Sequence, residues 1–233
     1  MHNAAIDENS IAAIQAALDE GATHVESDTH ATKDGTAVLF HDSDLNRVAG
    51  VDRRISDLDL GDLRAIRLRN GSEIPTLSNV FERFPDLYLN LDIKSEHAIE
   101  PTVRAIEQHQ AHDRVLVSSF SERRRKLALK LLSKPVATSA SMTTVLAAWA
   151  SHTFAFGLGF GVITRDIDAF QIPPSRGVIK FATTSFIQRA QRSKSEVHFW
   201  TINDPQEMQR LLALGADGIV TDRVDLLSKL KQS

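Results

Sequence analysis

Strand-like and helix-like segments alternate along almost the whole sequence. Short apolar runs are followed by longer stretches with helical spacing, and turn residues separate most of them. Repeated βα units predict parallel strands joined by right-handed crossovers. The alternation therefore predicts an α/β fold of the (β/α)₈ TIM-barrel type, as one domain over residues 1–233. The length agrees with this, because such barrels use roughly 250 residues.

The sequence provides one strand fewer than the predicted barrel needs. Ala37 to Phe40 follows the turn Lys33-Asp34-Gly35 as a second strand, and in counting barrel strands it is taken as an extension of the strand before it. Seven strands result, whereas a closed barrel of this type needs eight, and nothing before Glu8 supplies another. We therefore expect the first strand to be absent and the domain to be N-terminally incomplete. The predicted strands are Thr23 to His30, Leu87 to Ile93, Val115 to Phe120, Val136 to Ala140, Ala169 to Ile172, Val197 to Ile202 and Gly218 to Thr221.

Two helices have clear boundary signals. Asn9 or Ser10 can cap a helix whose apolar residues have helical spacing and which closes at Gly21. Near the end of the chain, Asp204-Pro205-Gln206-Glu207 combines a capping acid, a proline at the first position and a glutamate at the third. We expect this second helix to end at Gly215.

Carboxylates gather on one face of two predicted strands. Side chains alternate along a strand, so Glu26 and Asp28 share a face. The same parity places Asn90, Asp92 and Lys94 together. Buried carboxylates are costly unless they are compensated. Barrel enzymes carry their chemistry at the carboxyl ends of the strands, which is where these residues lie.

Two interpretations of these carboxylates remain open from spacing alone. Glu26, Asp28 and Asp92 would form an all-oxygen site suited to Mg²⁺ or Ca²⁺ rather than zinc. Alternatively, they form an internal salt-bridge network with Lys94 and an arginine.

His41 is the histidine with the most suggestive setting. His41-Asp42 follows the apolar run Val38-Leu39-Phe40, at the expected end of a strand. A histidine there can act as a general acid or base, because its pKa lies near neutral pH. A structural role is the alternative. The other histidines have no comparable setting, although His198 could face the same site.

Composition excludes several classes of function. The chain has no cysteine, which rules out disulfides, thiolate metal sites and a cysteine nucleophile. That composition fits a cytoplasmic protein without excluding an exported one. A formal charge of -3 gives no reason to expect a nucleic-acid partner. No apolar run is long enough to span a membrane, and we find no signal peptide at Met1.

Two further segments invite a functional interpretation. The basic run from Glu122 to Lys126 is expected to be a solvated helix face rather than a binding patch. Gly157-Leu158-Gly159-Phe160-Gly161 resembles a dinucleotide loop, but the third glycine of that fingerprint falls on Val162 and no strand precedes the segment. We interpret it as a flexible barrel loop.

A series of short motifs, in order along the chain, resembles the glycerophosphodiester phosphodiesterase family. The resemblance extends from Glu8 to about Leu226. It depends on the order and spacing of the motifs more than on any single motif. The motifs are Asp7-Glu8-Asn9-Ser10, Val25-Glu26-Ser27-Asp28, Thr32-Lys33-Asp34-Gly35, His41-Asp42, Ile74-Pro75-Thr76-Leu77, Asn90-Leu91-Asp92-Ile93-Lys94, Ser118-Ser119-Phe120, Trp200-Thr201-Ile202-Asn203 and Gly215-Ala216-Asp217-Gly218 with Thr221-Asp222.

The resemblance implies a (β/α)₈ barrel that hydrolyses glycerophosphodiesters to glycerol 3-phosphate and an alcohol. Glu26, Asp28 and Asp92 become ligands of a divalent cation. His41 becomes one of two catalytic histidines. The substrate-binding residues become Lys94 on the phosphate oxygens, Trp200 beside the glycerol moiety, and Glu8 near the first loop. We expect Lys94 and Trp200 to contribute to binding rather than to folding alone.

The sequence departs from the family pattern at two places. Asp92 stands where the family usually has glutamate; aspartate is one methylene shorter but is still a hard ligand. The second departure is the family's opening strand, which ends in His-Arg-Gly and supplies the other catalytic histidine and a phosphate-binding arginine. His2 is too close to Glu8 and lacks that arginine. We expect the natural product to carry this strand upstream.

Two other functions compete with this interpretation. The motifs do not fix the leaving alcohol, so a lysophospholipase D-type activity on a longer lipid is one alternative. The missing His-Arg-Gly favours another, a non-catalytic barrel that binds a metal and phosphate esters without turnover.

Overall fold

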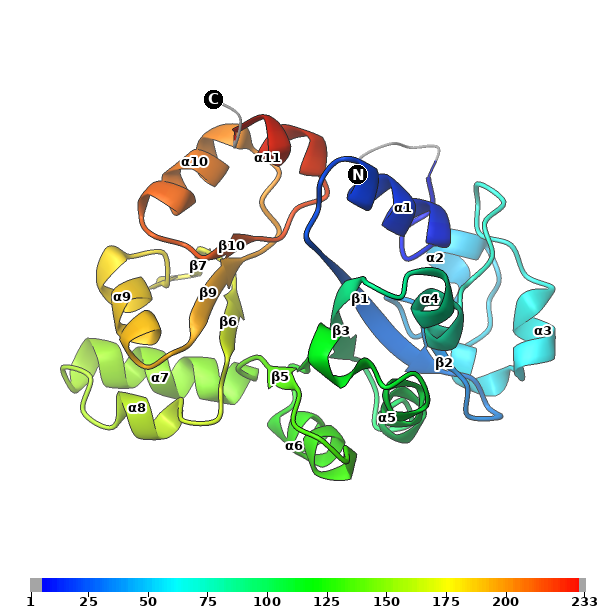
Figure 1. The fold of residues 1–233 in the computed structure, drawn as a ribbon, viewed down its shortest axis with the longest axis horizontal. Helices are drawn as coiled ribbons and strands as arrows, with labels where there is room; N and C mark the ends of the chain where they lie inside the picture. The colour runs from blue at the N-terminus through cyan, green and yellow to red at the C-terminus, as the bar shows by residue number, and fades with distance from the viewer. Residues whose placement is uncertain (1–5, 231–233) are drawn as a thin grey trace. The chain divides into compact units, whose positions relative to one another are not determined.

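The computed structural model describes residues 6–230, which form two compact units, each with parallel strands and an apolar core (Figure 1). Residues 6–119 and 123–136 make up the first unit, and residues 120–122 and 137–230 the second. His2 lies outside the described residues. The single barrel domain expected from the sequence stays a prediction.

The first unit contains three parallel strands. β1 pairs with β3, and β3 pairs with β4, as the βα repeats predicted. The turn and the second strand are confirmed by β2, but counting β2 as an extension was wrong, because it turns back and pairs antiparallel with β1, Thr29 opposite Leu39. Its elements are α1 (Ile11–Asp19), β1 (His24–Ala31), β2 (Ala37–Leu39), α2 (Asn46–Ala49), η1 (Ile55–Asp57), α3 (Leu60–Arg64), α4 (Leu77–Arg83), β3 (Tyr88–Ile93), α5 (Ile99–Gln108), η2 (Ala111–Arg114), β4 (Val115–Ser118) and most of α6 (Glu122–Leu131).

The main core of this unit lies between the strands and the helices α1, α4 and α5, which flank them in Figure 1. Leu89, Leu91 and Ile93 point from β3 into this core and are fully or almost fully buried. Burying one such side chain stabilises the fold by about 1.5–3 kcal/mol. Because side chains alternate, Asn90 and Asp92 must lie on the opposite face of the strand.

Helix α1 begins as the sequence predicted. Ser10 is the capping residue: its hydroxyl accepts a hydrogen bond from Ala13 N at 3.1 Å and donates one to Asp7 O at 2.7 Å. Asn9 has another role, because its side-chain oxygen accepts from the Ser27 hydroxyl on β1 at 2.6 Å. Asn9 and Ser10 are adjacent residues, and the hydrogen bonds of both fix the position of the backbone just after Glu8.

A polar clamp holds the end of α5. The carboxylate of Glu107 accepts from the backbone and the hydroxyl of Ser133, at 2.6 and 2.7 Å, and contacts His112 Nε2 at 3.1 Å. These interactions, Ser133 first, lower the pKa of Glu107 to about 2.

Replacing Glu107 by Gln should therefore lower stability in a pH-dependent way. A depressed carboxyl pKa contributes stability that is fully present above the unfolded value near 4.5 and is lost as pH falls towards 2. The difference in urea midpoint between wild type and Glu107→Gln should be largest near neutral pH and shrink in acid. Glu82→Gln, an exposed change on α4, should show no such dependence. An equal difference at all pH values would contradict the clamp.

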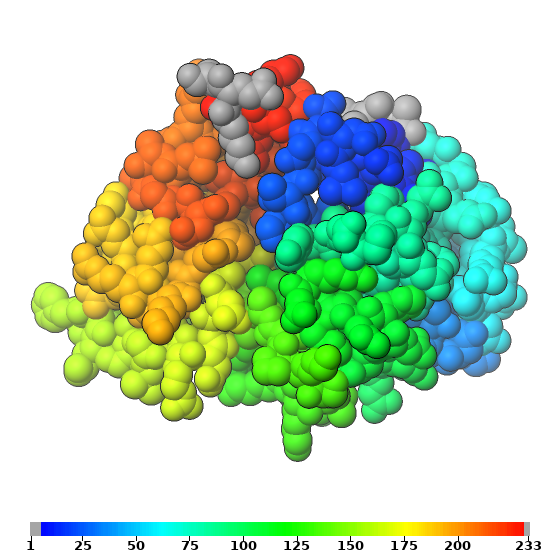
Figure 2. Space-filling model, in the orientation of Figure 1, coloured from blue at the N-terminus to red at the C-terminus, as the bar shows by residue number. Residues whose placement is uncertain are grey.

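The second unit has its own parallel strands, in the order β10-β9-β6, and an aromatic core around Phe170, Phe186 and Phe199. Asp204 caps α10 by accepting from Glu207 N at 3.1 Å, as predicted. The antiparallel pair β7–β8 was not predicted. Figure 2 shows one face of both units with side chains filled in. The elements are β5 (Ala137–Thr138), α7 (Met142–Phe154), α8 (Phe160–Ile163), β6 (Ala169–Ile172), β7 (Ser175–Arg176), β8 (Ile179–Lys180), α9 (Thr184–Arg192), β9 (Glu196–Phe199), α10 (Pro205–Ala213), β10 (Gly218–Ile219) and α11 (Val224–Leu230).

Two expectations about surface segments need correction. The basic run is not wholly solvated: Arg125 is buried, and Arg124 hydrogen-bonds to backbone and side-chain groups of the first unit. The glycine-rich segment is not simply a loop, because Phe160–Ile163 forms α8. Within residues 6–230, no helix is both long and apolar enough to cross a membrane.

Candidate active site

The predicted carboxylates lie on neighbouring strands. Asp28 on β1 is the register partner of Asp92 on β3, and Glu26 is the partner of Asn90. Asp28, Asn90 and Asp92 are buried, whereas Glu26 is exposed. The shared face that strand parity predicted for Asp28 and Asp92 is therefore present, at the carboxyl ends of both strands.

Lys94 joins the two buried aspartates. Its ammonium nitrogen lies 2.7 Å from Asp28 Oδ1 and 2.8 Å from Asp92 Oδ2. Burial raises the pKa of Asp28, an effect that Lys94 partly offsets. Burial acts to lower the pKa of Lys94, but Asp92 and Asp28 together outweigh it and the pKa is raised. Lys94 thus stays charged at neutral pH and supplies a positive centre between two acids.

The backbone around Lys94 is fixed from two sides. Lys94 N donates to Thr29 O on β1 at 3.2 Å. Arg124 on α6 donates through Nη1 to Lys94 O, and through Nε to the Ser119 hydroxyl at 3.0 Å. That hydroxyl donates in turn to Ile93 O at 2.8 Å. Sequence reasoning missed Arg124, which lies in a run of basic residues typical of a solvated face.

His41 heads a line of alternating charges. Its Nδ1 lies 2.7 Å from Asp42 Oδ1, and Asp42 Oδ2 accepts from Arg47 Nε at 2.6 Å. Arg47 Nη1 donates to Glu8 Oε2 at 3.0 Å. Arg47 first, and then His41, hold the pKa of Asp42 below its usual range. An ionised Asp42 favours the tautomer of His41 that carries its proton on Nδ1, which leaves Nε2 for proton exchange.

Two contacts tie Phe40 and His41 to β1, the strand that carries Asp28. Phe40 N donates to Asp28 O at 2.9 Å, and His30 Nε2 contacts His41 O at 3.2 Å. His41 is near enough to act electrostatically on the Asp28 carboxyl. Burial lowers the pKa of His30, which keeps this imidazole neutral at pH 7. His30 shares the face of Asp28, a position that strand parity could have revealed.

The predicted trio of metal ligands is not assembled as a group. Among residues 6–230, no three His, Asp or Glu side chains form a cluster that could hold a metal ion. The donor chemistry nevertheless fits a hard cation, because Asp92 Oδ1 and Asn90 Oδ1 are buried oxygens without a hydrogen-bond partner in the described part of the chain. The salt-bridge alternative is present in part, because Lys94 joins Asp28 and Asp92.

Comparison with known proteins decides the family. The sequence profile of the glycerophosphoryl diester phosphodiesterase family matches residues 2–226. A probable glycerophosphodiester phosphodiesterase 2 of Mycobacterium tuberculosis is 42% identical over 225 residues, which cover 94% of this chain and 83% of the relative. The chain belongs to the glycerophosphoryl diester phosphodiesterase family. It is an enzyme family whose members hydrolyse glycerophosphodiesters and generally depend on a divalent cation.

Solved structures of this family share the fold. A glycerophosphodiester phosphodiesterase of Thermotoga maritima superposes with a TM-score of 0.76 at 25% identity, covering 97% of this chain and 92% of that one. A phosphodiesterase of Oleispira antarctica, in complex with the product sn-glycerol-3-phosphate, gives 0.73 at 24% identity, with coverages of 97% and 92%. The fold is therefore TIM-barrel-like; its closure and the absent first strand stay predictions.

The remaining predicted site residue of the phosphodiesterase lies in the second unit. Trp200 follows β9, its amide donates to Ile172 O at 3.2 Å, and its ring forms an edge contact with Phe120. His198, on the same face of β9, pairs with Glu196 at 2.9 Å. The assignment of Trp200 to the glycerol moiety stays a prediction, as does substrate binding by Glu8.

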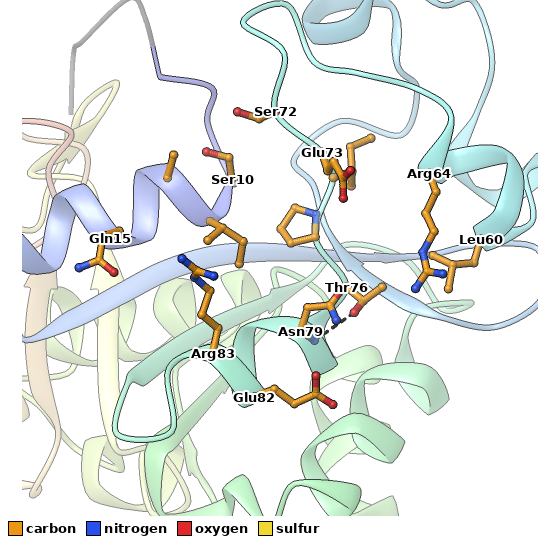
Figure 3. A pocket seen from close by; sticks show the side chains of 14 residues that line it. Ser10, Gln15, Leu60, Arg64, Ser72, Glu73, Thr76, Asn79, Glu82 and Arg83 are labelled. Carbon is orange, nitrogen blue, oxygen red and sulfur yellow. Dashed lines mark hydrogen bonds between the residues drawn. The ribbon is translucent and has the colours of Figure 1, made fainter.

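A separate groove of about 890 Å³ lies between α1, α3, α4 and residues 72–76 (Figure 3). Arg64 and Arg83 contribute side chains to it, but none of the predicted site residues is among those that line it. The hydroxyls of Ser10 and Thr76 in its wall already cap α1 and α4. These two hydroxyls therefore have structural roles.

Proposed function

We propose that this phosphodiesterase converts glycerophosphodiesters to glycerol 3-phosphate and an alcohol through the residues around Lys94 and His41. Lys94 binds the phosphate oxygens, and His41 transfers a proton. Glu26, Asp28 and Asp92 are the proposed ligands of a divalent cation, Mg²⁺ or Ca²⁺. The observation that carries the proposal is the charged Lys94 between Asp28 and Asp92, beside a histidine oriented by its own carboxylate.

The proposed reaction breaks the bond between phosphorus and the oxygen of the leaving alcohol, while an oxygen from water forms the new bond to phosphorus. The departing oxygen gains a proton, and the attacking water loses one. His41 Nε2 is the proposed partner in one of these transfers, with Asp42 holding the protonated ring at Nδ1. Lys94 neutralises charge on the phosphate oxygens, which phosphoryl transfer requires more than covalent chemistry.

A bound divalent cation would add charge neutralisation at the phosphate and would hold it in place. The orphaned Asp92 Oδ1 and the adjacent Asp28 support its location, and both are hard oxygen donors. Glu26 would join them from the exposed end of the same face.

Product analysis tests the proposal. Glycerophosphocholine, glycerophosphoethanolamine and a lysophospholipid should be offered separately with Mg²⁺ or Ca²⁺, and the phosphate products identified. Release of glycerol 3-phosphate from the first two supports a glycerophosphodiester substrate. Release of lysophosphatidate alone would assign the chain to the lysophospholipase D alternative, and no turnover of any substrate would contradict the proposal. The cytoplasmic location suggested by the cysteine-free composition stays a prediction for cell fractionation.

Replacing Asp42 by Asn should lower kcat about tenfold, a loss of about 1.4 kcal/mol of transition-state stabilisation. The amide keeps the shape but no longer fixes the proton on His41 Nδ1. Stability should change little, because such exposed pairs contribute about 0–1 kcal/mol. Steady-state kinetics and NMR of the His41 ring nitrogens would check this; Asp44→Asn is a matched control in the same loop. Unchanged kcat with an unchanged tautomer would contradict a positioning role for Asp42.

A further inference from the structure

Four apolar side chains are exposed within nine residues, from the last residue of α7 through the connecting segment into α8. Phe154, Phe156, Leu158 and Val162 are 73%, 91%, 82% and 78% exposed. In Figure 2 this segment, coloured yellow-green, projects at the left edge of the view. Single exposed apolar residues are ordinary on a protein surface, but a cluster of large ones marks a site of interaction. We call residues 154–162 the α7–α8 turn.

The α7–α8 turn is held in shape rather than left loose. Arg189 Nη1 donates to Phe156 O at 2.7 Å, and the Ser151 hydroxyl donates to Leu158 O at 2.7 Å. Gly157 N donates to Ser151 O at 2.8 Å. Gly157 has a φ of +87°, a backbone conformation that favours glycine, and a Cβ there would displace the Arg189 guanidinium, since it would lie 1.0 Å from Nη1. These contacts fix a conformation in which the apolar side chains point outward.

The sequence around the turn is poor in acids. Between Glu122 and Glu196, its only acidic residues are Asp166 and Asp168. Asp168 is already engaged, because its Oδ2 accepts from Thr138 N at 2.8 Å. The basic residues of the second unit in this stretch are Arg165, Arg176, Lys180, Arg189, Arg192 and Lys194. Arg165 pairs with Asp166 at 3.5 Å, so the excess of positive charge in this stretch comes from the other basic residues.

Several of these basic residues lie beside the turn. α9 packs on α7 through an edge contact between His152 and Phe186, at a centroid distance of 5.5 Å. At the end of α9, Ser193 lies beside α8, since a Cβ on Gly161 would be 4.0 Å from the Ser193 hydroxyl. Arg192 and Lys194 flank Ser193 in the sequence and are exposed. An apolar tip with a basic rim is the surface that results.

We propose that the α7–α8 turn docks the protein on an anionic lipid surface. The apolar side chains would enter the boundary between headgroups and acyl chains, and the basic rim would meet the negative headgroups. The rim argues for lipid rather than a second copy of this chain, because two identical basic rims would repel each other. The proposal is independent of the catalytic assignment, since binding to vesicles needs no substrate.

Vesicle sedimentation tests this with the full chain. Vesicles of phosphatidylcholine alone are compared with an equimolar mixture of phosphatidylcholine and phosphatidylglycerol. Wild type should bind the mixed vesicles, and salt should weaken binding. The double variant Phe156→Ser/Leu158→Ser should bind at least about tenfold more weakly. Val178→Ser removes an apolar side chain that is 99% exposed on another segment of the same unit and should bind like wild type. Arg192→Gln/Lys194→Gln should lose binding to the mixed vesicles.

Three outcomes would overturn the proposal. Wild type fails to bind either vesicle; the Phe156→Ser/Leu158→Ser variant binds as tightly as wild type; or analytical ultracentrifugation shows a wild-type dimer that this variant abolishes, without any binding to vesicles. The last result would assign the turn to self-association. Thermal melts of all variants should match wild type, because the substituted side chains are exposed.

Discussion

Replacing His41 by Asn should lower kcat by about 10²–10⁴-fold, the usual contribution of one general acid or base. Asparagine can hydrogen-bond to Asp42 but cannot transfer a proton near neutral pH. Stability should be nearly unchanged, because His41 is more than half exposed and its pairing with Asp42 is a surface interaction. Steady-state kinetics on the substrate that product analysis identifies, together with a thermal melt, would measure both effects.

The matched control is His24→Asn. His24 is also exposed and lies at the amino end of β1, away from Asp28 on the same strand. It should retain wild-type kcat. Added imidazole should restore part of the activity of His41→Asn, since a small base can occupy the space of the missing ring. If the His41 variant keeps kcat within a few fold of wild type, the proton-transfer assignment is wrong.

The parallel strands of both units could be predicted because their signal is local. Each predicted strand within residues 6–230 has a counterpart, and Ala169–Ile172 was found with the predicted bounds. β7 and β8 were missed because two residues each are too short to show alternation, although the glycine between them is a turn signal. The strand β2 was predicted after its turn, but it was wrongly counted as an extension of β1, because its apolar residues look alike in an extension and in an antiparallel edge strand.

The parts of the candidate site that depend on strand parity could be predicted from the sequence. The contacts between loops could not. Asp28 and Asp92 face the same way because parity and register allow nothing else. The contact of Arg47 with Glu8 joins residues 39 apart through two loops, and no periodic pattern encodes it. Strand parity also predicted that Lys94 lies on the same face as Asp92. It did not predict that the Lys94 ammonium would lie between Asp28 and Asp92.

Replacing Lys94 by Met should destabilise the first unit by about 3–5 kcal/mol, because it leaves two buried carboxylates without their shared partner. For a chain of this length, each kcal/mol corresponds to about 2–4 °C in melting temperature. Lys33→Met, an exposed lysine in the nearby turn, is the control and should melt like wild type. Asp28→Asn combined with Lys94→Met should recover part of the loss, since only one buried charge remains.

Lys94→Met also distinguishes the two interpretations of the buried carboxylates, a cation site and a salt-bridge network. If Asp28 and Asp92 are cation ligands, removing the competing ammonium increases the affinity for Mg²⁺ or Ca²⁺. A cation at 100 times its Kd stabilises by about 2.7 kcal/mol, so it should raise the melting temperature of Lys94→Met more than that of wild type. Chelation should reverse the gain. Equal or absent shifts in the two proteins would leave only the salt-bridge network.

The cation-restored Lys94→Met protein then tests phosphate binding without the confusion of partial unfolding. A charged hydrogen bond contributes about 1.5–3 kcal/mol, so calorimetry should show glycerol 3-phosphate binding weakened about 10- to 150-fold. Lys94→Arg should keep part of the affinity, because it retains the positive charge but changes its shape. Equal affinity in Lys94→Met and wild type would make Lys94 purely structural, with its charge serving only Asp28 and Asp92.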